Sequence, residues 1–312
     1  MRTVTVFAPA SIGNVCVGFD TLGLALPGLG DRCRVRVRDP RSSVSIVDFE
    51  TVTGQPGTEP LPEASQSNAA VIAASAVLER VGGGHVEMSL HKGLPTGSGL
   101  GSSSASAVAA AQATNLALGN PLRPLQVLGC CLEAEAAVSG RHADTIAPSR
   151  LGGRVRVRRL DPRDVVRLPV PEGLTVVLIR PELSLLTSAG RGVIPESMAM
   201  EDSVAHSANL GSFVAACYSG DLDLMSRCVV DPIAEPVRIG MIKGGAEALA
   251  AMRAAGAIAA SISGSGPALF ALCRSKASAA DVADAGVAAM QSAGVEATHV
   301  VAPADSPGAR EV

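Results

Sequence analysis

The sequence of 312 residues contains very few aromatic side chains: no Trp, one Tyr and five Phe. Proteins that bind single-stranded nucleic acid stack the bases on aromatic rings, and they attract the phosphate backbone with a basic surface. With 26 Lys and Arg against 29 Asp and Glu, the net charge of -3 supplies no such surface. Nucleic-acid binding is therefore disfavoured.

Long apolar runs are also missing, although 47% of the residues are hydrophobic. A membrane-spanning helix needs about 20 consecutive apolar residues, and Arg, Asp, Glu, Gly or Pro interrupts every run before that length. The N-terminal segment MRTVTVFAPAS has one Arg and no long apolar stretch, so we expect no signal peptide. The sequence predicts a soluble globular protein without a membrane partner, built from one large domain or two modest ones.

The seven cysteines include no C-x-x-C pair. An odd set without the spacing of a zinc site or a disulfide framework is typical of reduced thiols in a hydrophobic core. We therefore expect a cytoplasmic protein.

Alternation of apolar and polar residues predicts strands over 3–7, 31–39 and 43–50. In the second strand four arginines alternate with apolar residues, at positions Arg32, Arg34, Arg36 and Arg38. Such a row could bind phosphate, but a solvated strand face explains the period of two and is the favoured interpretation.

Helices are predicted over 68–81, 102–118 and 124–138, with a strand over 85–91 before the glycine-rich loop and another over 152–160. Residues 161–173 carry three prolines and no long period, so they are the predicted domain boundary. Beyond them the order is a strand over 174–181, helices across 197–255, two strands joined by a tight turn, a helix and a last strand. This order is typical of a ferredoxin-like fold.

Three alternating glycines, Gly97, Gly99 and Gly101, precede three serines at the start of the second predicted helix. Glycine allows positive φ and close backbone approach, and the N–H groups at a helix start attract anions such as phosphate. The alternative is a flexible turn whose serines only cap the helix. The loop fits neither the Walker A pattern nor the dinucleotide fingerprint, because it lacks a Lys after a glycine and has Ser at position 102.

Two further glycine-rich segments stand out. Ser263 to Pro267 lies between two apolar strands and is most simply a hairpin turn. Residues 8–26 carry Asn14 and Asp20 between glycines, where polar side chains either satisfy the backbone of a turn or face a ligand.

In order and spacing, these segments resemble the three motifs of the GHMP kinase family: a P-x-S-x-x-N type segment, a P-x-x-x-G-L-G-S-S loop and a G-S-G turn. Here they are Pro9 to Asp20, Pro95 to Ser104, and Ser263 to Pro267. Within the family, GFDTLGLAL, SGRHADTIAP, T-x-x-x-R-x-x-x-P and DPIAEPVR are similar to members that act on homoserine. The resemblance implies a two-domain α+β fold, with an N-terminal α/β, ATP-binding domain built on a mixed sheet (1–165) and a C-terminal ferredoxin-like domain (166–312).

The resemblance implies an enzyme that transfers the γ-phosphoryl group of ATP, with Mg²⁺, to the side-chain hydroxyl of L-homoserine. The product would be O-phospho-L-homoserine, on the route to threonine. Two alternatives stay open: a kinase for another small hydroxylated substrate, such as threonine or an isoprenoid alcohol, and a ligand-binding relative without catalysis. The apolar surplus also favours a homodimer.

The resemblance also implies which residues bind ATP and metal. The ATP-binding set is Pro95, Thr96, Gly97, Ser98, Gly99, Leu100, Gly101, Ser102, Ser103, Ser104, Gly264 and Gly266. For Mg²⁺ it implies Glu135 with either Ser103 or Ser102, since carboxylate and hydroxyl oxygens suit this cation. Glu133 is the competing carboxylate.

Six residues are implied for the substrate and the chemistry: Asn14, Asp20, His142, Thr145, Arg191 and Arg238. An arginine suits a carboxylate and an aspartate suits an ammonium group. Arg238 could also form an ion pair with Glu235. Thr145 stands where the homoserine-acting members have Asn, and since threonine is no base at neutral pH, we expect it to align the substrate hydroxyl rather than deprotonate it.

Overall fold

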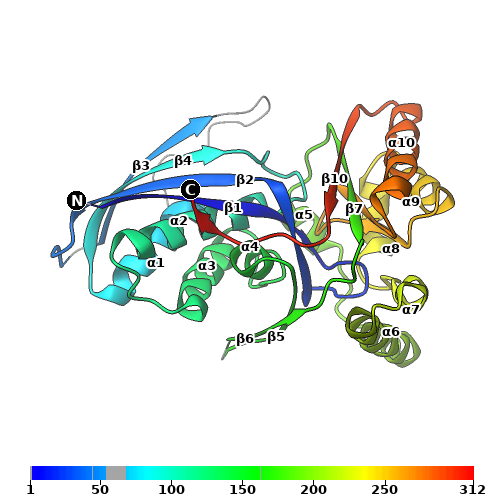
Figure 1. Cartoon of the computed structure of the whole chain (residues 1–312), viewed down its shortest axis with the longest axis horizontal. Coiled ribbons are helices and arrows are strands. Elements are labelled where there is room, and N and C mark those ends of the chain that lie inside the picture. Colours follow the sequence, from blue (N-terminus) through cyan, green and yellow to red (C-terminus); the bar gives the residue numbers. More distant parts are fainter. Residues whose placement is uncertain (1, 44, 54–67, 162) are drawn as a thin grey trace.

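The computed structural model describes residues 2–43, 45–53, 68–161 and 163–312. Two sheets lie next to each other along the long axis of the molecule (Figure 1). Within these described ranges, the first sheet has seven strands and the second has four. No helix in the same ranges has the length and hydropathy needed to cross a membrane.

The first sheet is mixed, as expected. Its strands are β1 (Thr3–Gly13), β2 (Leu22–Asp39), β3 (Ser45–Thr53), β4 (Gly84–Lys92), β5 (Arg154–Leu160), β6 (Arg163–Leu168) and β11 (Arg310–Glu311). The strand order is β11-β1-β2-β4-β3, and β5 pairs with both β2 and β6. The β3–β4 pair is parallel and the others are antiparallel.

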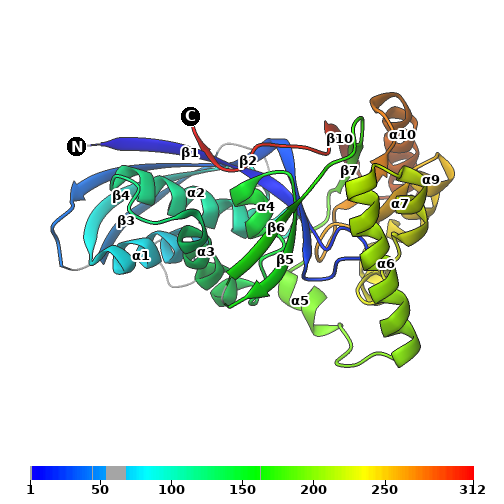
Figure 2. The ribbon, with the colours of Figure 1, turned by 60° about the horizontal axis from the view of Figure 1, so that its bottom comes forward.

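Helices cover one face of this sheet (Figures 1 and 2). They are α1 (Ala69–Val81), α2 (Ser102–Ala117), α3 (Pro124–Val138) and α4 (Ile146–Leu151). The side chain of Asn68 accepts a hydrogen bond from the N–H of Ala70 and so caps α1, and Gly82, with φ 95°, ends it in the left-handed region. The alanines of α2 are almost all buried, and their small side chains let this helix pack closely against the sheet. The three predicted helices are confirmed.

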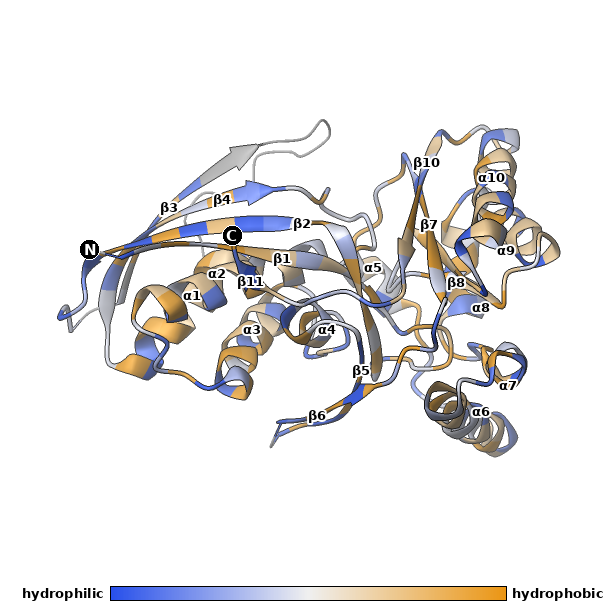
Figure 3. Cartoon of the chain, in the orientation of Figure 1, coloured by the Kyte–Doolittle hydropathy of each residue, from blue (hydrophilic) through white to orange (hydrophobic). Residues whose placement is uncertain are grey.

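The arginine row lies on the outer face of β2, as predicted. Arg32, Arg34, Arg36 and Arg38 are exposed, whereas the alternating residues Cys33, Val35 and Val37 are buried. Figure 3 shows the same alternation in hydropathy along the strand. The strand begins earlier than predicted, at Leu22, because residues 22–26 are buried on both faces and carry no alternating pattern.

The second sheet has the ferredoxin-like strand order. Its strands are β7 (Thr175–Pro181), β8 (Ala259–Ile262), β9 (Leu269–Cys273) and β10 (Ala297–Pro303), ordered β10-β7-β9-β8 and antiparallel throughout. Helices α9 (Gly245–Ala254) and α10 (Lys276–Ser292) pack against it. Four more helices lie between β7 and α9 in the chain: α5 (Thr187–Gly192), α6 (Met200–Ser219), α7 (Leu222–Cys228) and α8 (Glu235–Arg238).

The region predicted as an irregular boundary is partly regular. Residues 163–168 form β6, a short strand that the sequence did not predict and that extends the sheet as a hairpin with β5. The chain passes to the second sheet between Leu168 and Thr175, and β11 returns to pair with β1. The division into 1–165 and 166–312 stays a prediction, and it falls inside β6.

Candidate active site

A cavity of about 350 Å³ is lined by elements of both halves of the molecule. The first half contributes the segment after β1, the starts of α1 and α2, the end of α3 and residues 139–145. The second half contributes α5, the end of α8 and the turn at Gly264 and Ser265. All six residues predicted for the substrate and the chemistry line this cavity: Asn14, Asp20, His142, Thr145, Arg191 and Arg238.

The glycine loop lies where side chains would not fit. Gly97, Gly99 and Gly101 have φ of 68°, 76° and 64°, in the left-handed region that favours glycine. A Cβ on Gly99 would lie 2.7 Å from the carbonyl oxygen of Gly266, and the Ser263 hydroxyl donates to the Gly99 carbonyl at 2.6 Å. The two glycine segments therefore pack directly against each other.

Helix α2 begins at this loop without a side-chain cap. Its N-cap residue is Gly101, and no side-chain hydrogen bond caps the helix. The interpretation in which the serines only cap the helix is therefore wrong. The first N–H groups of a helix have no intrahelical partners and, with the helix dipole, they favour an anion such as phosphate.

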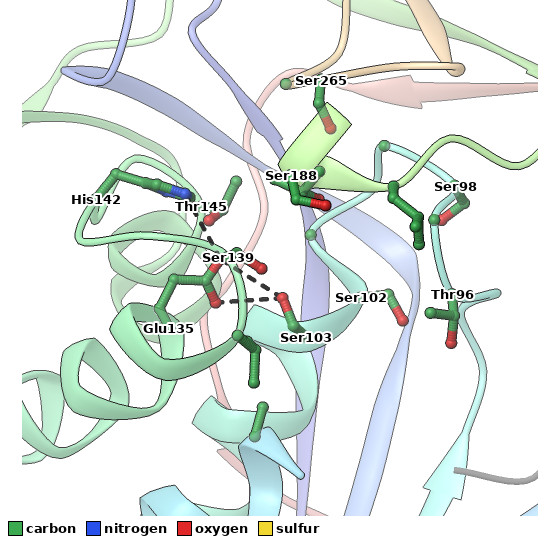
Figure 4. Close-up of a pocket in the computed structure, with 18 of the residues that line it drawn as sticks. Thr96, Ser98, Ser102, Ser103, Glu135, Ser139, His142, Thr145, Ser188 and Ser265 are labelled. Atoms are coloured by element: carbon green, nitrogen blue, oxygen red, sulfur yellow. Dashed lines mark hydrogen bonds and ion pairs between the residues drawn. The ribbon is translucent and has the colours of Figure 1, made fainter. Parts of the chain in front are cut away.

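The serines at the start of α2 have different partners. The Ser102 hydroxyl donates to the Leu94 carbonyl at 3.0 Å and accepts from Lys92 Nζ at 2.8 Å. The Ser103 hydroxyl instead donates to Glu135 Oε2 at 3.2 Å, as Figure 4 shows. Of the two serines considered for the metal, Ser103 therefore lies beside the carboxylate.

Glu135 and Glu133 occupy different environments. Glu135 is 2% exposed and lines the cavity, whereas the Glu133 side chain is 52% exposed and forms an ion pair with Arg80. Burial raises the pKa of Glu135, although charged His142 and the serine hydroxyls favour its ionised form. A buried carboxylate beside a hydroxyl is a suitable part of a shell for a hard divalent cation, and Glu133 is not placed to compete for it.

His142 is held by Asp144. Its Nδ1 lies 3.2 Å from Asp144 Oδ1, and its Nε2 lies 3.9 Å from Glu135 Oε1. Burial acts to lower the pKa of His142, but the hydrogen bond and charge of Asp144, with the charge of Glu135, raise it to about 9. His142 is therefore protonated at neutral pH. Asp144 also accepts from the backbone N–H of Asn14 at 3.0 Å, which ties the first motif to this segment.

Thr145 contacts the start of α2 rather than its own helix. It is the N-cap residue of α4 but makes no side-chain capping bond there. Its Oγ1 lies 2.8 Å from the Ser104 hydroxyl, which also lies 3.1 Å from Glu135 Oε2. The threonine hydroxyl is thus linked to Glu135 through one serine.

Two arginines and one aspartate lie at the other end. Arg191 Nη1 donates to Asp20 Oδ2 at 2.7 Å. Arg238 is 4% exposed and donates to the carbonyls of Gly190 and Gly264, at 2.8 and 2.9 Å. Burial and the neighbouring Arg191 lower its pKa. The alternative in which Arg238 forms an ion pair with Glu235 is not found in the described chain, because Glu235 pairs with Arg253 at 2.8 Å instead.

Asn14 joins the two halves across the cavity. Its Nδ2 donates to the Gly264 carbonyl at 3.2 Å, and its Oδ1 accepts from the N–H of Asp20 at 3.1 Å. Asn14 and Asp20 both have positive φ, 66° and 56°, which Asn and Asp tolerate better than most residues. The sequence left open whether these polar side chains satisfy backbone groups or face a cavity, and Asn14 does both.

Four residues predicted to bind ATP are not among the described lining of the cavity: Pro95, Leu100, Ser104 and Gly266. Pro95 accepts a hydrogen bond from the Ser98 hydroxyl at 2.7 Å, and the Leu100 side chain is fully buried in the core. The Ser104 hydroxyl contacts two residues of the lining, Glu135 and Thr145. The lining includes Ala69, Val138 and Leu186 and, over the described ranges, no Phe, Tyr or Trp ring.

A buried ion pair between Lys92 and Asp31 lies below the loop, and it was not predicted from the sequence. Both side chains are almost fully buried, and Lys92 lines the cavity and donates to the hydroxyls of Ser102 and Ser106 at 2.8 and 2.9 Å. Asp31 accepts from the N–H of Gly93 at 2.8 Å, so the pair fixes the chain at the entry to the loop. A signal was present, because each residue occupies an inward position of its strand.

The fold and the site together define a phosphotransferase of the GHMP kinase type. Residues 68–153 match the GHMP kinases N terminal domain and residues 213–291 match the GHMP kinases C terminal domain. The chain belongs to the GHMP kinase family.

Relatives that match almost the whole chain include homoserine kinases. The homoserine kinase of Chlorobium phaeobacteroides (strain BS1) is 36% identical over 291 residues, which cover 91% of each chain. That of Moorella thermoacetica is 40% identical over 272 residues, 86% of each chain. The crystal structure of homoserine kinase from Cytophaga hutchinsonii superposes with a TM-score of 0.92 at 36% identity, covering 100% of this chain and 98% of that one.

Proposed function

We propose that the chain phosphorylates the side-chain hydroxyl of L-homoserine with ATP and releases O-phospho-L-homoserine and ADP. The observation that carries this proposal is the cavity itself. It has a glycine loop and helix start suited to phosphate at one end, and two arginines with an aspartate suited to an amino acid at the other. The near full-length similarity to homoserine kinases supports the same substrate.

The phosphates of ATP would lie against the N–H groups of the loop from Thr96 to Ser103, with the start of α2 beneath them. Glu135 and Ser103 would hold Mg²⁺, which when bound neutralises charge on the phosphate oxygens. Lys92 uses its donors on Asp31, Ser102 and Ser106, so its role is to fix the loop.

Phosphoryl transfer depends mainly on position and charge, so the chain needs no strong base. Arg191 and Arg238 would hold the substrate carboxylate and Asp20 its ammonium group. The Thr145 hydroxyl, fixed by Ser104, would align the nucleophilic oxygen of the substrate. Protonated His142, near Glu135, adds positive charge next to the site of transfer.

The test is a coupled ADP-release assay with Mg-ATP and a panel of homoserine, threonine, serine, mevalonate and galactose. We expect homoserine to stimulate ADP release well above the other compounds. Stimulation by a different member of the panel would reassign the substrate, and no stimulation by homoserine would refute the proposal. The predictions of a cytoplasmic location and of a homodimer rest on the composition alone.

A further inference from the structure

Two groups that suit opposite ends of an amino acid form an ion pair with each other beside the cavity. Arg191 Nη1 lies 2.7 Å from Asp20 Oδ2. The two side chains are 35% and 36% exposed, and both line the cavity. The cation that would hold a carboxylate is therefore paired with the anion that would hold an ammonium group.

Arg238 does not share this arrangement. It is buried, and it donates to two backbone carbonyls, those of Gly190 and Gly264. It has no carboxylate partner in the part of the chain that the structure describes. Its guanidinium lies 5.7 Å from the centre of the Phe19 ring, and that of Arg191 lies 5.5 Å from the same ring, so the two cations lie on one side of the cavity next to the same residue. The charges of Asp20, Asp231 and Asp144 also act on Arg238, but none of these carboxylates forms an ion pair with it in the described chain.

We propose that the Asp20–Arg191 ion pair is an internal competitor that makes the site select for zwitterions, a proposal that rests on the proposed function. A ligand with only a carboxylate takes Arg191 and leaves Asp20 without its cation. A ligand with only an amine takes Asp20 and leaves Arg191 without its anion. An amino acid replaces both partners at once, because its ammonium group pairs with Asp20 while its carboxylate pairs with Arg191.

The competition between the Asp20–Arg191 ion pair and a ligand should change ligand affinity by a measurable factor. Ion pairs at this level of exposure change equilibria by about two- to fivefold. A charge-assisted hydrogen bond to a ligand contributes at least about tenfold. Removing the Asp20 carboxylate should therefore raise the affinity for ligands that have only a carboxylate and lower the affinity for amino acids. The loss of an ordinary binding residue would raise no affinity.

The variant Asp20→Asn isolates this effect. Asp20 has φ 56°, and Asn tolerates this left-handed conformation, so the turn should keep its shape. We expect homoserine to bind the variant at least about tenfold more weakly. We expect 4-hydroxybutyrate, which has the hydroxyl and the carboxylate but no amine, to bind about two- to fivefold more tightly than to the unaltered chain.

The reciprocal variant Arg191→Gln should show the opposite preference. It frees the Asp20 carboxylate, so 3-amino-1-propanol, which has the hydroxyl and the amine but no carboxylate, should bind more tightly than to the unaltered chain. A matched control is Asp164→Asn, because Asp164 is also 36% exposed and ion-paired, with Arg158 on the β5–β6 hairpin. This control should change none of the affinities.

Calorimetry with the three compounds and the full chain, in the presence of Mg²⁺ and a non-hydrolysable ATP analogue, gives the affinities directly. Weaker or unchanged binding of 4-hydroxybutyrate to Asp20→Asn would overturn the proposal. The proposed function is tested separately, by homoserine-dependent ADP release from the unaltered chain. If the unaltered chain phosphorylates homoserine but Asp20→Asn does not bind 4-hydroxybutyrate more tightly, the proposed function stands and the proposed competition by the ion pair is refuted.

Discussion

Replacement of Glu135 by Gln tests the assignment of the metal site. The side chain is 2% exposed and its carboxylate lies 3.2 Å and 3.1 Å from the hydroxyls of Ser103 and Ser104. Gln keeps an oxygen that can accept from these hydroxyls but removes the negative charge that a divalent cation requires. We expect turnover to fall by about 10²- to 10³-fold, the usual cost of losing one preorganised electrostatic contact to the transition state.

Stability should respond differently from activity. Without a metal ion, burial raises the pKa of Glu135, which means that its charged form is held at a cost. Gln removes this cost and keeps the serine contacts, so the free energy of unfolding of the metal-free chain should change by no more than about 1 kcal/mol. Mg²⁺ with ATP should raise the melting temperature of the unaltered chain and much less that of the variant.

Glu133→Gln is the matched control on the same helix. Glu133 is two residues away, and its ion pair with Arg80 is exposed, so its loss should cost less than about 1 kcal/mol and leave turnover within about twofold. The assays are coupled ADP release at varied Mg²⁺ and thermal unfolding with and without Mg-ATP. If Glu135→Gln keeps turnover within about fivefold and retains the Mg-dependent shift in melting temperature, the metal assignment is wrong.

Three further predictions concern the rest of the site. Thr145→Ala should lower turnover by less than about tenfold, because the threonine only aligns the hydroxyl; complete loss of turnover with intact homoserine binding would contradict this. Gly99→Ala should raise the KM for ATP and lower the melting temperature. Its control is Gly28→Ala, where φ is 83° and an added Cβ would have no atom within 4 Å. This variant adds only backbone strain and should leave the KM unchanged. The pKa of His142 is raised from 6.5 to about 9, so protonated His142 stabilises the folded state. This contribution is complete below pH 6.5 and is lost as the pH rises through about 9. Denaturant unfolding of the metal-free chain should therefore show that His142→Gln removes this part of the pH dependence.

The sequence predicted those elements whose pattern is local. The period of two in 31–39 and the caps at Asn68 and Gly82 identified a strand and a helix, since both signals depend on neighbouring residues alone. Alternating glycines before a helix made this loop a candidate for phosphate binding, but the same pattern also fits a flexible turn, and the family resemblance was needed to favour the first interpretation. In contrast, β6 was missed because a short, half-exposed hairpin strand has a weak alternating pattern.

The partners of charged residues could not be predicted, because they depend on tertiary contacts. Glu133 and Glu135 lie about 200° apart around α3, and that helix is buried over much of its surface, so hydropathy alone does not show which of them faces the cavity. Arg238 has Glu235 three residues before it, a spacing that favours an ion pair on a helix. Glu235 instead reaches Arg253, and Arg238 turns to two carbonyl groups from other segments.

The charges that remain incompletely matched point to what the cavity binds. Around it, Lys92 pairs with Asp31, His142 with Asp144 and Arg191 with Asp20. Within the described residues, the only cationic side chain near the Glu135 carboxylate is His142, at 3.9 Å, and Arg238 has no carboxylate as an ion-pair partner. Glu135 and Arg238 are hydrogen-bonded to neutral groups, which leaves their net charges without a close counter-charge, so each end of the cavity favours a ligand group of the opposite sign. A cation beside Glu135 at the phosphate loop and a carboxylate beside Arg238 meet both requirements, and Mg-ATP with an amino acid supplies them together.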